Sequence, residues 1–190
     1  MAILQEQNTK QEILNDAAKR MMAAARTAPK AKGRNTLEII IVDGDDLKKL
    51  RMEMVRLGKE TQTEFFIRDA NHIPEIAAAL LVGTTIKTLG LNEICQLCGF
   101  KNCSEKEKYP NTPCIFNTGD LHLALGSAAM ISASSGIDSR IMFSVGKAAL
   151  SLGLFHSDIK IAMGILISME SKNPFFDRTI QTNLYPNINE

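Results

Sequence analysis

Four cysteines are the residues of this 190-residue chain whose type and spacing best suit chemistry. They are Cys95, Cys98, Cys103 and Cys114, spaced as C-x2-C-x4-C-x10-C. Cysteine thiolates bind metals, and the first three lie close enough for a single loop to wrap a metal centre. Gly99 allows the tight backbone approach that sulfur ligands need, and Pro113 stiffens the chain before the last cysteine. We therefore interpret the four cysteines as the ligands of one metal centre.

Three kinds of site are open for these cysteines. An iron–sulfur cluster needs four thiolates from a loop with free backbone N–H groups, and a single short window of cysteines suits it best. Structural zinc also takes four thiolates, usually as two close pairs, but Cys103 and Cys114 are too far apart to form a second pair. Uncoordinated or redox-active thiols are the third kind. We favour a cluster of the 4Fe-4S type, with a four-cysteine zinc site as the alternative.

The composition is that of an ordinary globular protein, with 22 Lys and Arg against 21 Asp and Glu. The resulting formal net charge of +1 offers no overall field for nucleic acid or an anionic membrane. No segment reaches the roughly 20 apolar residues that span a bilayer, and the first residues lack the features of a secretory signal. We therefore expect a cytoplasmic protein, in which thiols stay reduced and can bind metal.

Hydrophobic periodicity predicts the elements that must position the cysteines. Helices are expected from an N-cap at Thr9 to Pro29, from the turn at 43–46 to about Lys59, over 120–132 with Asp120 as a cap, and over 143–152. Strands are expected over 37–42, 63–67, 77–83 and 159–168, and residues 92–117 are expected to be irregular. Because helices alternate with strands, we predict one α+β domain over 1–190 with three layers and a cysteine-rich loop at 92–117 within it.

A short basic stretch at 26–34 is the second feature that suits a ligand. Gly33 would let backbone N–H groups approach an anion, and Lys30, Lys32 and Arg34 would supply positive charge. The same side chains could instead be loop charges that meet only water. The histidines show no metal-binding spacing, and no P-loop, dinucleotide-binding or serine-hydrolase motif occurs. The catalytic acid or base therefore stays unknown.

Two resemblances support the cluster. The run CQLCGFKNC (95–103) resembles the C-x2-C-G-x3-C segment of small four-iron, four-sulfur domains in corrinoid iron–sulfur proteins, whose fourth cysteine usually lies farther on than Cys114. The whole chain resembles a prokaryotic family of unknown function whose members are described as containing a ferredoxin domain. The segments that carry this resemblance are AARTAPKAKGRNTLE (24–38), FFIRDA (65–70), CQLCGFKNC (95–103), DLHLALGSAA (120–129) and SKNPFFDR (171–178).

A more remote resemblance is to FMN-dependent nitroreductases. AARTAPKAKGRNTLEIIIV (24–42) resembles their A-x-x-A-P-S-x-x-N-x-Q-P-W segment and first strand, although Thr36-Leu37-Glu38 replaces Q-P-W and their R-x-S-x-R signature is missing. The Ala- and Gly-rich helix at 120–132 resembles their central, dimer-forming helix. The resemblance implies that Lys32, Arg34 and Asn35 would contact the flavin and that Arg178 would approach its phosphate.

Together the resemblances imply a nitroreductase-like fold, a homodimer and a redox function. An iron–sulfur cluster would pass single electrons, and FMN, if bound, would serve an oxidoreductase acting on a small-molecule substrate or with a redox partner protein. The alternative is a non-enzymatic binding or structural module with zinc on the four cysteines. Neither nucleic acid nor a membrane is expected as a partner. The segment NPFFDR (173–178) is expected to pack on a partner subunit, to cover a site, or to dock as a plain tail.

Overall fold

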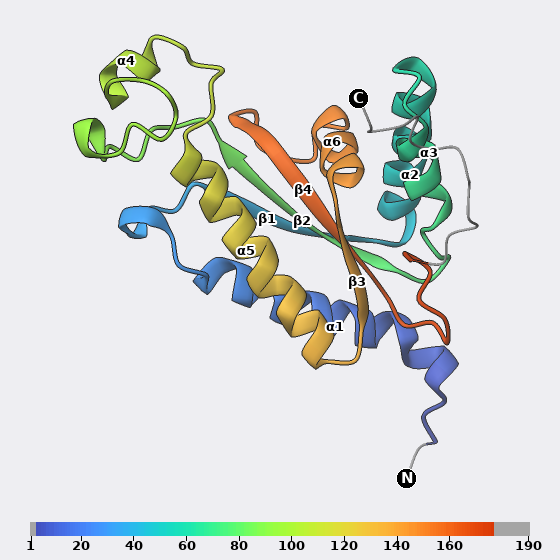
Figure 1. Cartoon of the computed structure of the whole chain (residues 1–190). Coiled ribbons are helices and arrows are strands. Elements are labelled where there is room, and N and C mark those ends of the chain that lie inside the picture. The colour runs from blue at the N-terminus through green and yellow to red at the C-terminus, as the bar shows by residue number, and fades with distance from the viewer. Residues whose placement is uncertain (1–2, 177–190) are drawn as a thin grey trace, which may run out of the picture.

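The computed structural model describes residues 3–176, which form a four-stranded antiparallel sheet with helices on both faces (Figure 1). The strands are β1 (Leu37–Asp43), β2 (Ala78–Thr85), β3 (Asp138–Met142) and β4 (Ile159–Ser168), in the order β1-β2-β4-β3. The inner position of β2 follows from its sequence, AALLVGTT, which has no charged side chain and is buried along its whole length.

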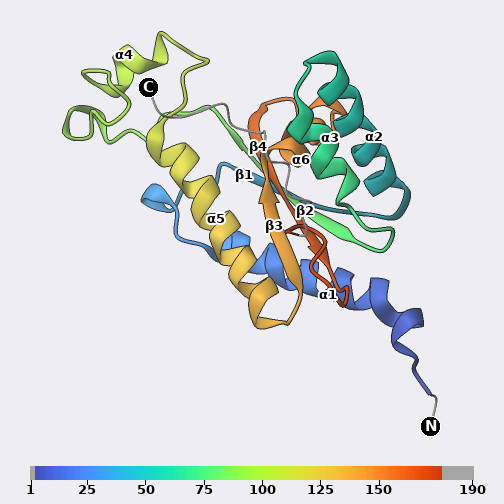
Figure 2. The same ribbon diagram turned by 45° about the vertical axis from the view of Figure 1, so that its right-hand side comes forward.

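Helices cover the sheet on both sides and make three layers (Figures 1 and 2). One face carries α1 (Glu6–Thr27) and α5 (Ile115–Ser134), and the other carries α2 (Gly44–Glu60), α3 (Glu64–Asn71) and α6 (Phe143–Ser151). Leu80 belongs to the apolar core under α1 and α5, whereas Leu81 belongs to the core under α2 and α6. Successive side chains of a strand point to opposite faces, so one buried strand supplies both cores. This is the three-layer α+β fold expected from the sequence.

Two expected elements were wrong. Residues 63–67 do not form a strand, because Thr63 is the N-cap of α3 and the following residues are helical. Phe66 and Ala70, four residues apart, face the core from this helix. The strand was predicted because the adjacent aromatic residues Phe65 and Phe66 are also typical of strands. Helix α1 begins at Glu6, so Thr9 is not its cap and its hydroxyl instead donates to the Glu6 carbonyl.

Strand β3 was missed, since it is a short edge strand in which only Met142 is buried. Two of the predicted strands, 37–42 and 159–168, are found as β1 and β4, and the third, 77–83, as β2. Helix α5 starts five residues before the expected position, at Ile115, directly after the last cysteine. That early start brings the cysteine-rich segment into contact with the helix that lies across the sheet.

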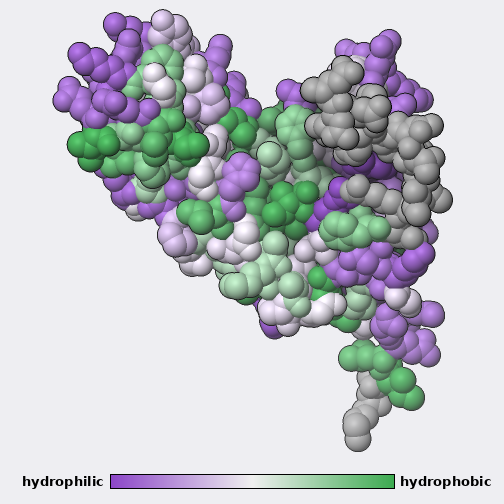
Figure 3. Space-filling model, viewed as in Figure 1, coloured by the Kyte–Doolittle hydropathy of each residue, from purple (hydrophilic) through white to green (hydrophobic). Residues whose placement is uncertain are grey.

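Residues 86–114, which we call the cysteine lobe, leave the layered body between β2 and α5 (Figure 1). The lobe contains the 3-10 turn η2 (Asn92–Ile94) and the short helix α4 (Cys103–Glu107) in otherwise irregular chain. It projects from the body, and apolar side chains gather on its lower part beside hydrophilic ones (Figure 3). The expected irregular segment is therefore present, with one short helix inside it and its last residues already in α5.

The end of the described chain packs on the edge of the sheet. Phe175 is fully buried, its carbonyl accepts a hydrogen bond from Arg140 at 2.7 Å, and Asn173 donates to Asp138 at 2.9 Å. Residues 173–176 therefore dock on β3 of their own chain. Arg178, implied above as a flavin contact, lies outside the described residues. Within the described part of the chain, we find no helix both long and apolar enough to cross a membrane.

Candidate metal centre and basic loop

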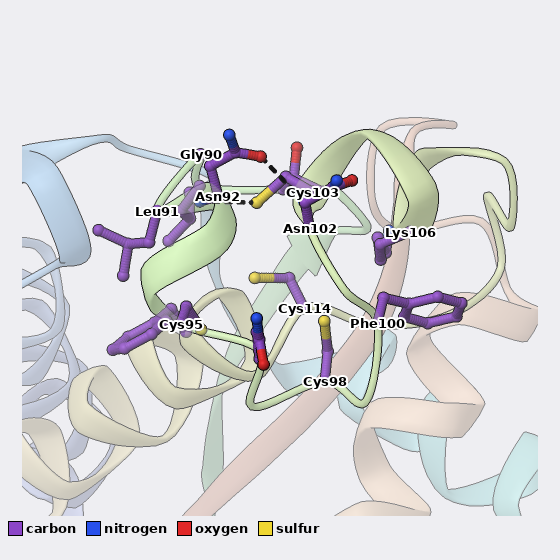
Figure 4. Close-up of a pocket in the computed structure, with 14 residues that line it drawn as sticks. Gly90, Leu91, Asn92, Cys95, Cys98, Phe100, Asn102, Cys103, Lys106 and Cys114 are labelled. Carbon is purple, nitrogen blue, oxygen red and sulfur yellow. Dashed lines mark hydrogen bonds between the residues drawn. The ribbon is translucent and has the colours of Figure 1, made fainter.

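All four cysteines line one hollow in the cysteine lobe (Figure 4). Cys95 follows η2, Cys98 lies in the next turn, Cys103 begins α4, and Cys114 is the N-cap of α5. In Figure 4 the sulfur atoms of Cys98, Cys103 and Cys114 point towards the interior of the hollow. None of the four forms a disulfide. The residues predicted as one ligand set therefore line the same hollow, each from a different local structure.

The backbone of the lobe is bent by residues in the left-handed region. Asn92, Gln96 and Gly99 have φ values of 50°, 51° and 83°, a conformation that is uncommon except for glycine and, less so, asparagine. The N–H of Asn92 lies 3.2 Å from the sulfur of Cys103, and its side-chain oxygen accepts from the Cys103 N–H at 3.3 Å. An N–H donor on a cysteine sulfur is a typical way to stabilise a thiolate that binds a metal.

The interior of the hollow is small and largely apolar. Its cavity volume is about 20 Å³, and its walls include Leu89, Leu91, Phe100 and Phe116. Cys114 is buried, while the other three cysteines are half-buried. Among residues 3–176, no three or more His, Cys, Asp or Glu side chains are grouped closely enough to hold one metal ion. Four cysteines suit a metal centre in kind and number, but as placed here they do not converge on one ion, so binding a cluster requires the lobe to rearrange.

The first turn of α5 adds to the suitability of the hollow for negative charge. Cys114 precedes the helix, where unpaired N–H groups and the helix dipole favour anions, and no acidic residue lies in the first turn. A thiolate at this position would therefore be favoured by the helix itself.

The basic stretch includes a 3-10 turn, η1 (Ala31–Gly33), and one of its lysines has a structural role. The ammonium of Lys30 donates to the carbonyls of Arg26 and Ala28, both at 2.7 Å, and so caps the carboxyl end of α1. Burial lowers the pKa of Lys30 below its usual value, the nearby Arg26 lowers it further, and Asp120 opposes the change. Lys30 is therefore not a free loop charge.

The three described residues of the implied flavin site lie on the surface. Lys32 has a φ of 56°, and its ammonium donates to the carbonyl of Gly90 in the cysteine lobe at 2.6 Å. Asn35 accepts hydrogen bonds from Arg26 and from the Leu37 N–H. Arg34 is exposed. The basic loop therefore touches the lobe that carries the cysteines, because Gly90 also lines their hollow.

A buried polar network joins the same regions and was not predicted. The side-chain amide of Asn117 donates to the hydroxyls of Thr36 and Thr84, each at 2.9 Å, and its oxygen accepts from the Lys87 N–H. Asp120 does not cap α5 as expected, since it lies inside the helix and accepts the Ala31 N–H on both oxygens. The sequence signal that could have revealed this network is the pair Asn117 and Asp120, two polar residues three positions apart on the buried face of an apolar helix.

Comparison with protein families gives two matches. The sequence model of a family described as "Uncharacterized protein containing a ferredoxin domain" matches residues 111–178. A curated protein of Archaeoglobus fulgidus, itself described as uncharacterized, is 41% identical over 184 residues, which cover 93% of this chain and 97% of the relative.

Solved structures with the same fold include an oxidoreductase containing FMN, a nitroreductase and a BluB-like flavoprotein. An oxidoreductase containing FMN has a TM-score of 0.56 at 13% identity, covering 83% of this chain and 67% of that one. The nitroreductase CinD from Lactococcus lactis, in complex with nicotinic acid, has a TM-score of 0.55 at 14% identity, covering 87% and 78%. A BluB-like flavoprotein from Clostridium difficile 630 has a TM-score of 0.54 at 15% identity, covering 80% and 79%. At these identities the likeness establishes the nitroreductase-like fold.

Proposed function

Because this chain belongs to the family of uncharacterized proteins that contain a ferredoxin domain, we propose that it is a redox protein whose four cysteines hold an iron–sulfur cluster. The observation that carries the proposal is that Cys95, Cys98, Cys103 and Cys114 all line one hollow. The backbone N–H directed at the Cys103 sulfur and the helix N-terminus at Cys114 support it, since both favour thiolates. A cytoplasmic location is part of this proposal, because reduced thiols are kept there.

FMN is the second cofactor that we propose, bound at the basic loop. The fold neighbours include an oxidoreductase containing FMN, and Lys32, Arg34, Asn35 and Arg178 are the proposed contacts. Arginine matches a phosphate with paired hydrogen bonds, so Arg34 and Arg178 would hold the phosphate end. When both groups are bound, the cluster supplies single electrons and the flavin supplies hydride transfer to a small molecule.

The position of Lys32 supports a link between the two proposed sites. Its ammonium contacts Gly90, and Gly90 lines the hollow of the cysteines. The left-handed backbone at Lys32 is unfavourable for a residue with a side chain, and such conformations are often kept where function needs them. A flavin on this loop would therefore lie close enough to the lobe for electrons to pass between them.

A homodimer formed through α5 completes the proposal. Ile115, Leu123 and Met130 are exposed on one side of this helix, and Gly119 and Gly126 between them have open space where a Cβ would lie. Apolar and weakly polar residues cover much of α5 in the view of Figure 3. An exposed apolar face of this kind is typical of a subunit interface. Met130→Glu should convert a dimer to monomer in sedimentation experiments, whereas Met52→Glu, similarly exposed on α2, should leave the dimer intact.

Anaerobic purification followed by metal, sulfide and flavin analysis tests the proposal. We expect iron and sulfide in equal amounts, a broad absorption band near ~400 nm, and loss of both in Cys98→Ser. A colourless protein with one zinc per chain would show instead that the cysteines form a structural zinc site. Full iron content in Cys98→Ser would contradict the ligand assignment.

A further inference from the structure

The three most exposed large apolar side chains between residues 5 and 176 lie on the cysteine lobe and on α5. They are Ile94, which is 87% exposed, and Leu97 and Met130, which are each 66% exposed. Ile94 and Leu97 belong to the lobe segment before α4, whereas Met130 lies on α5 with Ile115 and Leu123, which are about half exposed. Single apolar side chains are common on a protein surface, but a group of them this exposed indicates an interaction surface.

The apolar surfaces of the lobe and of α5 lie on the same face of the molecule. Figure 3 shows apolar residues on the lower part of the lobe and along α5 in a single view, and Figure 1 shows that the segment before α4 forms this lower part. The two surfaces also follow one another along the chain, because α5 begins directly after the last residue of the lobe. A partner placed on the exposed side of α5 would therefore lie beside the lower part of the lobe.

The exposed side of α5 is too small to form a stable dimer by itself. The helix has 20 residues, which at about 1.5 Å per residue gives a length of roughly 30 Å. Because a helix is about 10 Å across, one side of α5 offers roughly 300 Å² of contact, or roughly 600 Å² for two subunits together. Stable protein interfaces bury about 1,200–2,000 Å² in total. The homodimer proposed above therefore needs further contact surface on the same face as α5.

We propose that a second copy of this chain covers the lower part of the cysteine lobe, with Ile94 and Leu97 of each subunit packed on the other subunit. The proposal rests on the proposed function, since it extends the homodimer formed through α5. A two-fold axis repeats the contact, so the lobes of both subunits add apolar area to the interface. The lobe has little regular structure of its own, and contact with the second copy would therefore also limit its motion.

Analytical sedimentation over a range of protein concentrations tests the proposal, with all variants prepared in the same metal state. Ile94→Glu places a charge at the most exposed of these positions, and charges are disfavoured in the buried part of an interface. We expect the Kd of the dimer to rise at least about tenfold in Ile94→Glu. Met52→Glu is the control, because Met52 is 64% exposed on α2 across the sheet and should leave the Kd unchanged.

Hydrogen exchange gives a second measurement that leaves the lobe itself unaltered. Met130→Glu should make the protein monomeric, and the amides of residues 92–98 should then exchange at least about tenfold faster than in the wild-type dimer. A monomeric wild-type protein, or a Met130→Glu protein that stays dimeric, would overturn the homodimer through α5 and the lobe contact with it. A wild-type dimer whose Kd is unchanged in Ile94→Glu, and whose lobe exchanges equally fast in Met130→Glu, would overturn the lobe contact alone.

Discussion

Asn117 and Thr84 meet in the interior, where the side-chain amide of Asn117 donates to the Thr84 hydroxyl at 2.9 Å. Both residues are fully buried, and Thr36 completes the contact from the start of β1. The first turn of α5, and with it Cys114, is thereby joined to the sheet rather than to the lobe alone. The last cysteine therefore has a rigid support that the other three lack.

Removing the amide of Asn117 should weaken this support. Asn117→Ala would leave the Lys87 N–H without its acceptor and remove the two hydrogen bonds that Asn117 donates to the Thr36 and Thr84 hydroxyls, so the free energy of unfolding should fall by about 1–3 kcal/mol. Urea titration measures the change. Thr118→Ala is the matched control, because its hydroxyl bonds only to carbonyls of its own helix. Equal stability of the two variants would contradict a structural role for the network.

Removing the metal should affect the cysteine lobe and leave the sheet intact. The lobe has little regular structure and projects from the body, so bound metal would supply much of its order. After chelation, hydrogen exchange should become faster in residues 92–114 and stay slow in β2, whose side chains are all buried. Unchanged exchange in the lobe would mean that metal binding does not stabilise it.

Loss of a basic side chain from the proposed flavin site should weaken FMN binding. Arg34→Ala removes an exposed charge that forms no part of the core, so we expect about tenfold weaker FMN binding without a change in folding. Arg51→Ala, an exposed arginine on α2 across the sheet, is the control. Fluorescence titration with FMN measures the affinity. If neither Arg34→Ala nor Arg178→Ala changes it, the basic loop is not the flavin site.

Truncation of the docked C-terminal aromatic should destabilise the whole fold. Phe175 is fully buried in the core under α2 and α6, so Phe175→Ala should cost about 3–5 kcal/mol. Phe176 is 61% exposed and lies over Arg140, so Phe176→Ala should cost well under about 1 kcal/mol. Thermal unfolding of both variants checks the difference. Similar losses would show that the docking of this segment does not depend on Phe175.

The main strands and the central helix were predictable from the sequence because each has a local signal. Buried strands show as β-branched or apolar runs such as 37–42, and helices show as a period near four residues. The errors came where local signals conflict. The aromatic pair at 65–66 suits a strand as well as a helix, and packing against Gly58 of α2 decides for the helix.

By itself, the sequence determined that four thiols lie within one short segment, and it predicted the α+β domain that carries them. Only the tertiary structure decided that Lys30 caps a helix, that Lys32 contacts Gly90, and that Lys106 lines the same hollow as the cysteines. Each of these depends on a partner or a wall brought near by strand pairing or helix packing. A charged residue is written the same way in the sequence whether it lies in water or in a cavity. Its energy depends on burial, which arises only when distant segments of the chain pack together.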